Sequence, residues 1–337
     1  MPMITSTRQS VSARITSRRD WLPVALWAAA LILLAVAAGV RPGAVLPAAR
    51  VTLGPFVVLA AIIAGSVLAG RIGLFRALAK LLIADGAPRP VVAGSVLVLT
   101  ALLAALANLD VAVVVAMPVA MQAAARHRLP AGRLAAAVAV TANSASFLLP
   151  TSNITSLLLL ERVPLPSLAY LQGSWLAWML VVTITIGSLS CWLARAGTGA
   201  VRGGHAQPSG RAVLDLIPMY LAATAIRAIL ATGITLRGGL AAQLAEGSAL
   251  ASLVNNLPAA AAFRPAGTAG LWAAILATAI GPGLLITGSV ATIICRRIAM
   301  ESGATLRTWQ FTLIGSALMP AQLVVAVIGL HLTGALS

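Results

Sequence analysis

The 337-residue chain is 60% hydrophobic and only 9% charged, and its mean hydropathy of +1.00 excludes an ordinary soluble globular protein. The formal net charge is +16, but the basic residues sit between apolar runs with little aromatic interleaving, so membrane topology explains them better than nucleic-acid binding. Apolar runs of about 20 residues favour spanning helices over membrane β-strands. We therefore expect an all-α polytopic membrane protein.

The first part of the chain predicts a basic tail followed by two spans. Residues 1–20 are rich in Ser, Thr and Arg, and the apolar run at 21–40 is long enough to cross a bilayer. Because no convincing cleavage site follows it, we expect an uncleaved first helix with a cytoplasmic N-terminus. After a Pro/Gly turn at 41–43, a second span is expected at roughly 51–70. The basic stretch 71–82 predicts an interfacial helix on anionic lipid.

Two interrupted apolar segments come next. Residues 90–125 form two short arms divided by Ala107-Asn108-Leu109-Asp110, which predicts a re-entrant hairpin, with two short full spans as the alternative. Residues 132–162 are of spanning length but are broken in the middle by Leu-Pro-Thr-Ser-Asn. Irregular backbone at that depth is tolerated only where it is buried in protein or lines a wet cavity.

The second half of the chain repeats this plan. A span at about 168–194 completes a first half at 21–194, and a Gly-rich hydrophilic linker, 195–212, is expected on the cytoplasmic side. The second half, 213–337, carries the following elements in the same order: a span at 213–232, a hairpin at 239–263 with Asn255-Asn256, a broken helix at 268–298 with Gly-Pro-Gly, and a span at about 309–332. Thr151 aligns with Thr287 without a gap across the two breaks.

The distribution of arginines supports an inverted arrangement of the two halves. With the N-terminus inside and both hairpins re-entrant, seven spans place the C-terminus outside and most basic residues inside, as the positive-inside rule requires. The outside then receives only Arg41, Arg50, Arg162, Arg237 and Arg264, while Arg227 lies near the outer end of a span. Two spans separate the broken helices, so these run in opposite directions and the repeats are inverted, as in many secondary transporters.

These motifs together resemble the ion transporter superfamily and, within it, the arsenical pump membrane protein family. The most specific likeness lies in LVNNLP (253–258) and GPGLLITGSVAT (281–292). The family usually has Asn and Asp adjacent at the first hairpin tip, whereas Leu109 separates them here, and the first arm of the second hairpin is shortened. The resemblance implies a transporter that exports arsenite or antimonite.

The chemistry is expected at the breaks and the hairpin tips. Amide N–H groups at the start of a half-helix favour anions or polar oxygens, and carbonyls at the end of the preceding one favour cations. The candidate substrate- or ion-binding residues are Asn108, Asp110, Ser152, Asn153, Thr155, Asn255, Asn256, Thr287, Ser289 and Thr292. The structural alternative is that they only cap helices or join them by hydrogen bonds.

Asp110 is the one acidic residue expected at membrane depth, which makes it the candidate proton carrier. The alternative is a carboxylate permanently paired with an arginine or with backbone groups. No catalytic motif, nucleotide-binding loop, cofactor site or metal-ligand spacing is expected, and Cys191 and Cys295 read as inert thiols.

We therefore hypothesise a secondary active transporter in the cell membrane that moves a small inorganic oxyacid or anion, most plausibly arsenite or antimonite. Transport would be coupled to a proton or sodium and would work by alternating access. A sodium/proton antiporter or a carboxylate or citrate carrier is the alternative within transport. A non-transporting membrane interaction protein is the alternative of another class. A homodimer and a separate ATPase partner are both left open.

Overall fold

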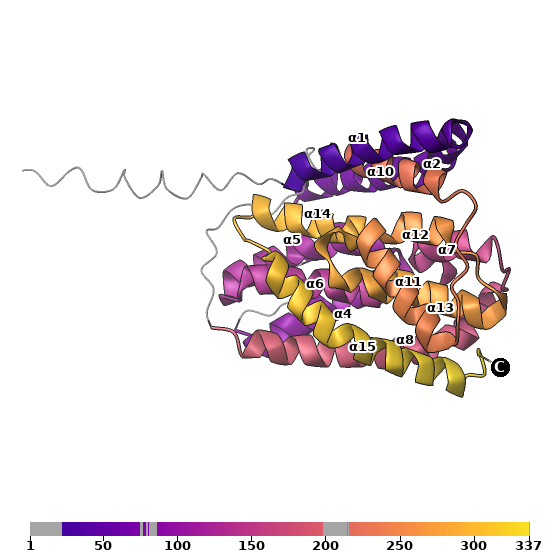
Figure 1. Ribbon diagram of the computed structural model, residues 1–337. Helices are drawn as coiled ribbons and strands as arrows, with labels where there is room; N and C mark the ends of the chain where they lie inside the picture. The colour runs from indigo at the N-terminus through magenta and orange to yellow at the C-terminus, as the bar shows by residue number, and fades with distance from the viewer. Residues whose placement is uncertain are drawn as a thin grey trace, which may run out of the picture.

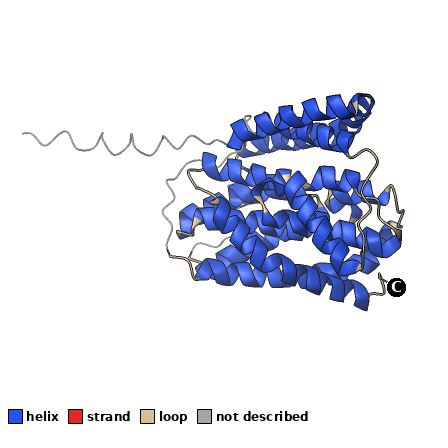
Figure 2. Ribbon diagram, viewed as in Figure 1, coloured by secondary structure: helices blue, strands red, loops and turns tan. Residues whose placement is uncertain are grey.

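The computed structural model describes residues 22–74, 77–78, 80, 86–197, 214 and 216–336. The expected basic tail (1–20), most of the interfacial helix (71–82) and most of the linker (195–212) lie outside these residues. Every named element in the described part is a helix, as Figure 2 shows. Six of these helices are long and apolar enough to cross a membrane, by length and composition. The expectation of a helical membrane protein is confirmed at this level.

The first half contains these helices, in chain order: α1 (Leu22–Val40), α2 (Pro42–Arg71), α4 (Arg89–Leu106), α5 (Leu109–His127), α6 (Ala131–Ser144), the 3-10 turn η2 (Pro150–Ser152), α7 (Ile154–Leu160) and α8 (Ser167–Ala194). The second half contains α10 (Leu216–Ile229), α11 (Leu240–Val254), α12 (Asn256–Ala262), α13 (Gly267–Ile280), the 3-10 turns η3 (Gly281–Leu284) and η4 (Ile286–Gly288), α14 (Val290–Glu301) and α15 (Thr308–Leu332).

One boundary differs from the sequence prediction. The residues expected to form a Pro/Gly turn at 41–43 instead begin α2, which has 30 residues and starts at Pro42. Proline is favoured at the first helical position because its missing N–H would be unpaired there anyway. The turn is therefore confined to Arg41, and the second helix is longer than the span expected at 51–70.

The two hairpins have unequal arms. In the first, α4 and α5 have 18 and 19 residues, and each is long enough to cross a membrane alone. In the second, α11 has 15 residues and α12 only seven. The re-entrant form of the first hairpin therefore stays a prediction beside the alternative of two full spans.

The helices form layers in which α1, α2 and α10 pack together along one side and α8 and α15 along the other (Figure 1). Between them lie the hairpins and the broken helices. Across the two halves, α5 contacts α14, and α12 contacts α7. The second arm of each hairpin therefore packs on the second segment of the other half's broken helix.

Small residues allow the close approach of these helices. All 14 residues of α6 except Gly132 and Arg133 are buried, and most of them are alanine, valine or serine. A methyl group on Gly132 would overlap the carbonyl oxygen of Thr305, so the chain before α15 lies directly on α6 there. Small residues at such contacts are typical of packing between membrane helices.

Candidate functional site

Both predicted broken helices are present. The first ends at Ser144 and resumes as α7 at Ile154, and the second ends at Ile280 and resumes as α14 at Val290. The side chain of Asn153 caps α7, where its Oδ1 accepts a hydrogen bond from the backbone N–H of Thr155 at 3.1 Å. Ser289 holds the corresponding cap position of α14 without a side-chain cap bond. The polar residues therefore stand where backbone N–H groups lack helical partners.

The side chain of Asn108 joins the tip of the first hairpin to the helix break in the same half of the chain by a hydrogen bond. The Oδ1 of Asn108 caps α5 by accepting from the backbone N–H of Asp110 at 2.8 Å. Its Nδ2 donates to the carbonyl of Thr151 at 3.2 Å. The amide side chain of Asn108 thus hydrogen-bonds both a backbone N–H at the start of α5 and an exposed backbone carbonyl of the break.

The second tip repeats the same pair of bonds. The Oδ1 of Asn255 accepts from the backbone N–H of Leu257 at 3.3 Å, and its Nδ2 donates to the carbonyl of Thr287 at 3.0 Å. Thr151 and Thr287 are the two residues that the sequence alignment of the halves pairs. The two hairpin tips therefore make the same pair of hydrogen bonds at positions that the sequence comparison aligns.

The two asparagines are expected to differ when each is replaced by alanine. Both variants lose a cap, which costs about 0.5–2 kcal/mol, but Asn255 also has a φ of +79° whereas Asn108 is extended at −175°. Asparagine tolerates a positive φ better than alanine, because its short polar side chain can hydrogen-bond to the backbone nearby, so alanine at position 255 also loses that compensation. Asn255→Ala should therefore lower the thermal midpoint in detergent more than Asn108→Ala, and Asn255→Gly should recover part of the loss. Equal losses for the two alanine variants would contradict this account.

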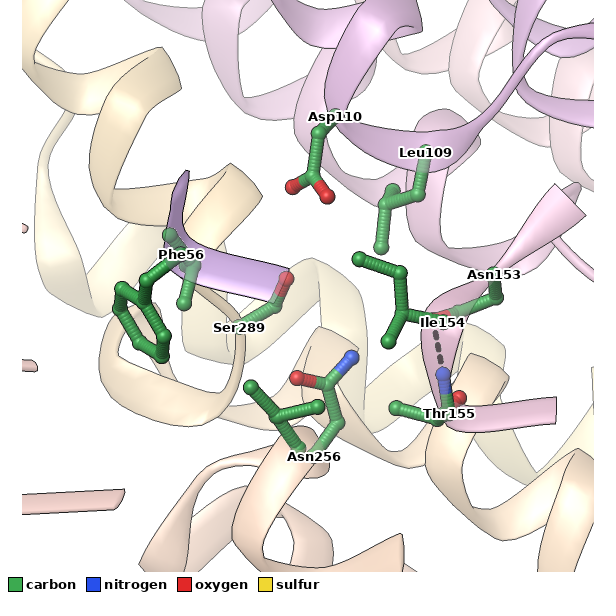
Figure 3. Close-up of a pocket in the computed structure, with 10 residues that line it drawn as sticks. Phe56, Leu109, Asp110, Asn153, Ile154, Thr155, Asn256 and Ser289 are labelled. Atoms are coloured by element: carbon green, nitrogen blue, oxygen red, sulfur yellow. Dashed lines mark hydrogen bonds between the residues drawn. The ribbon is translucent and has the colours of Figure 1, made fainter. Parts of the chain in front are cut away.

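The helix starts meet around a cavity of about 30 Å³. Figure 3 shows the carboxylate of Asp110, the amide of Asn256 and the hydroxyl of Ser289 directed toward a shared space. The lining consists of the first residues of α5, α7, α12 and α14 together with one residue of α2: Phe56, Leu109, Asp110, Asn153, Ile154, Thr155, Asn256, Leu257, Ser289 and Val290. The cavity therefore draws on both hairpins and both broken helices.

Two hydroxyl groups of the lining residues have no hydrogen-bond partner among the residues that the structure describes. Thr155 and Ser289 are 2% and 1% exposed, and neither Thr155 Oγ1 nor Ser289 Oγ has a hydrogen-bond partner. A buried polar group without a partner is costly, and such groups in native proteins call for an explanation such as a bound water or ion. Both residues line the cavity, so a water or a small polar solute bound there is a candidate partner for these groups.

The carboxylate of Asp110 is the one acidic group on the cavity wall. Its residue is only 9% exposed, and among the described residues no basic side chain forms an ion pair with it. Asp110 lies in the first turn of α5, where the helix dipole favours a negative charge. The predicted alternative of a permanent ion pair has no support in the described part of the chain.

Five of the ten predicted site residues line the cavity, and the other five hold the backbone around it. Ser152 has a structural role, since its Oγ donates a hydrogen bond to the carbonyl of Ala105 at 2.5 Å and accepts one from the backbone N–H of Leu149 at 2.9 Å. The Oγ1 of Thr292 accepts from the Nδ2 of Asn143 at 3.1 Å. The remaining three, Asn108, Asn255 and Thr287, take part in the bonds at the hairpin tips.

The residues around the site that were not predicted include Phe56 and Asn143. Phe56 of α2 closes one side of the cavity, and its ring packs edge-on against Tyr220 of α10 at 5.6 Å. Asn143, at the end of α6, is fully buried and joins the broken helices through Thr292, while its Oδ1 has no partner. A polar residue in the apolar run before Pro150 was the available signal for Asn143, whereas Phe56 had none.

No protein-family model matches the chain, and no curated protein matches it. Within the described residues, no group of three His, Cys, Asp or Glu side chains could hold a metal ion. The long apolar helices define the class of the molecule as a helical membrane protein. The site adds a small cavity between interrupted helices, with five polar residues set in an otherwise apolar lining.

Proposed function

We propose that the chain is a secondary active transporter that exports arsenite, antimonite or a similar small inorganic oxyacid or anion by ion-coupled alternating access. The observation that carries the proposal is the central cavity: within the described part of the chain, its lining holds two residues whose buried hydroxyls have no hydrogen-bond partner and one carboxylate without an ion pair. Interrupted helices whose ends surround a cavity are a common way to build a transport site. The inverted relation of the two halves is part of this proposal.

The size of the cavity favours a small solute. About 10–15 Å³ of such volume holds one water, and drug-sized pockets reach about 300–1,000 Å³. A cavity of about 30 Å³ therefore suits an ion or a small oxyacid better than citrate or a dicarboxylate. The hydroxyls of Thr155 and Ser289 and the amide of Asn256 can donate hydrogen bonds to the oxygens of such a solute.

The second candidate function, a sodium/proton antiporter, is favoured by one specific observation. The carboxylate of Asp110 has no basic partner among the described residues, so a bound proton or sodium ion would neutralise its charge. In the exporter the same carboxylate would supply the coupling site. The two functions differ in whether the hydroxyls on the opposite wall bind a solute.

Removal of those hydroxyls separates a binding role from a structural one. Because they have no protein partner, Thr155→Val and Ser289→Ala are expected to leave the thermal midpoint unchanged or slightly higher while weakening solute transport about tenfold. Ser152→Ala is the matched control, since it breaks a buried hydrogen bond and should cost about 1 kcal/mol of stability. Loss of stability in Thr155→Val with transport unaffected would assign the hydroxyl to the fold.

The proposal is tested by expression in an arsenite-sensitive bacterial host that lacks its own pump. Growth and cellular arsenite are measured for cells in which membrane insertion of the chain has been verified. If the inserted protein neither protects the cells nor lowers their arsenite, the arsenite reading is wrong. Everted vesicles with imposed proton or sodium gradients then separate the coupling ions and the antiporter alternative. Liposomes in which no solute moves would favour a non-transporting interaction protein.

A further inference from the structure

A second, smaller cavity lies next to the central one. Its volume is about 10 Å³, and it is bounded by α2, α7, α10 and α12. Leu257, the second residue of α12, lines both cavities. This one side chain therefore stands between the central cavity and the space beyond it.

One basic residue lines the second cavity, and two further arginines lie close to it. Arg227 of α10 lines it together with Pro258 and Ala261 of α12. Arg162, which follows α7, donates a hydrogen bond to the carbonyl of Ala261, and Arg264, which follows α12, donates to the carbonyl of Phe263 at 3.4 Å. We call Arg162, Arg227 and Arg264 the arginine cluster. All three meet at the C-terminal end of the short helix α12.

Opposite charge only partly balances this cluster. Burial first, and then the positive charges of Arg264 and Arg227, lower the pKa of Arg162 to about 10, and the negative charge of Glu161 opposes them. Glu161 is the acidic group that acts on the cluster, so three cations face one anion. A cleft lined by one sign of charge raises the local concentration of the opposite ion.

Capping of the C-terminal end of α12 explains the positions of Arg162 and Arg264 but not that of Arg227. The guanidinium groups of Arg162 and Arg264 bond backbone carbonyls at the end of α12, which is a usual place for cations. Among the described residues, the guanidinium of Arg227 has neither a hydrogen bond nor an ion pair, although its residue is half-buried. The charge of Glu161 favours the cationic form of Arg227, but a half-buried guanidinium that makes no hydrogen bond within the described residues still has donors available for an anion from solution.

We propose that the arginine cluster attracts small oxyanions and that Leu257 is the barrier through which they reach the central cavity. This inference rests on the proposed transport function, which supplies the identity of the solute. Within that class of substrate, it specifies that the anionic form is the one that enters. The geometry allows the barrier to move, because α12 has only seven residues and Asn255 holds its start through single hydrogen bonds. Pro258 lacks a backbone N–H and so adds no bond there.

The test measures access to Leu257 with charged thiol reagents and needs no transport. Leu257→Cys is made in a chain whose two native cysteines are replaced by alanine, and membrane-impermeant anionic and cationic methanethiosulfonates are compared. Each rate is normalised to the rate with a small free thiol. The anionic reagent is expected to react about tenfold faster than the cationic one. Arg227→Gln should remove that preference, whereas Arg237→Gln, an exposed arginine outside the cavity lining, should leave it unchanged.

Leu158→Cys, on the wall of the second cavity, provides an independent reporter in case Leu257→Cys does not fold. It should show the same preference for the anionic reagent and the same dependence on Arg227. The inference is wrong if the folded reporters are unreactive from both membrane sides, or if the ratio of rates does not depend on Arg227. If the ratio behaves as expected but liposomes move no solute, the proposed transport function fails while the anion-attracting path stands.

Discussion

Replacement of Asp110 by asparagine is expected to abolish gradient-driven solute movement while the protein remains folded. The amide is nearly isosteric with the carboxyl group, and the backbone N–H of residue 110 keeps its bond to the Oδ1 of Asn108. What is lost is the one acidic group on the wall of the central cavity. A loss of about 1.4 kcal/mol of interaction with the coupling ion already lowers affinity about tenfold. Uptake into everted vesicles under an imposed proton or sodium gradient measures the effect.

The controls separate charge from packing. Asp110→Glu keeps the charge and should retain part of the coupled activity, and Glu246→Gln, which changes an exposed carboxylate of α11, should have no effect. Since a buried carboxylate without a cationic partner is costly, Asp110→Asn should not lower the thermal midpoint. A fully active Asp110→Asn protein under the same gradient would show that Asp110 is not the coupling group.

The interruptions of the helices could be predicted because their causes are local. Pro150 and the Gly-Pro-Gly at 281–283 are poor helix residues in the middle of apolar runs. In the structure α13 ends at Ile280, directly before the Gly-Pro-Gly, whereas α6 already ends at Ser144 and Pro150 begins the 3-10 turn η2 within the break. The asparagines at the hairpin tips could be predicted for the same reason, since Asn is a favoured helix cap. The boundaries of the hairpin helices agree with the predicted ones to within a few residues.

Which polar residues face the cavity could not be predicted, because that depends on how each helix is rotated. Ser152 and Thr155 lie three residues apart, yet the hydroxyl of Ser152 bonds the carbonyl of Ala105, whereas Thr155 lines the cavity and its hydroxyl has no hydrogen-bond partner among the described residues. The sequence likewise contains no signal for Phe56, whose place on the cavity wall is set by the packing of α2 on α5 and α10. The orientation of the two halves in the membrane stays a prediction.

The site also depends on a contact that only the tertiary structure reveals. Gly315 of α15 lies against η3, the turn that opens the second break. A methyl group on Gly315 would overlap the carbonyl oxygen of Gly283 and lie 2.8 Å from its carbonyl carbon. Real Cβ atoms essentially never come that close to backbone, so the helix and the turn would have to separate. The position of η3 and of the chain leading to Ser289 therefore rests on the absence of a side chain at residue 315.

Gly315→Ala is accordingly expected to lower stability by about 1–3 kcal/mol, the usual cost of overpacking, and to reduce transport by shifting the turn that leads to Ser289. Gly187→Ala in α8 is the matched control, because a methyl group there meets nothing within 4 Å. That control should gain about 0.5–1 kcal/mol, since alanine loses less backbone entropy in a helix than glycine. Thermal unfolding in detergent followed by size-exclusion chromatography measures both variants. If Gly315→Ala proves as stable as Gly187→Ala, α15 does not lie directly on the break, and the close contact that fixes this side of the site is absent.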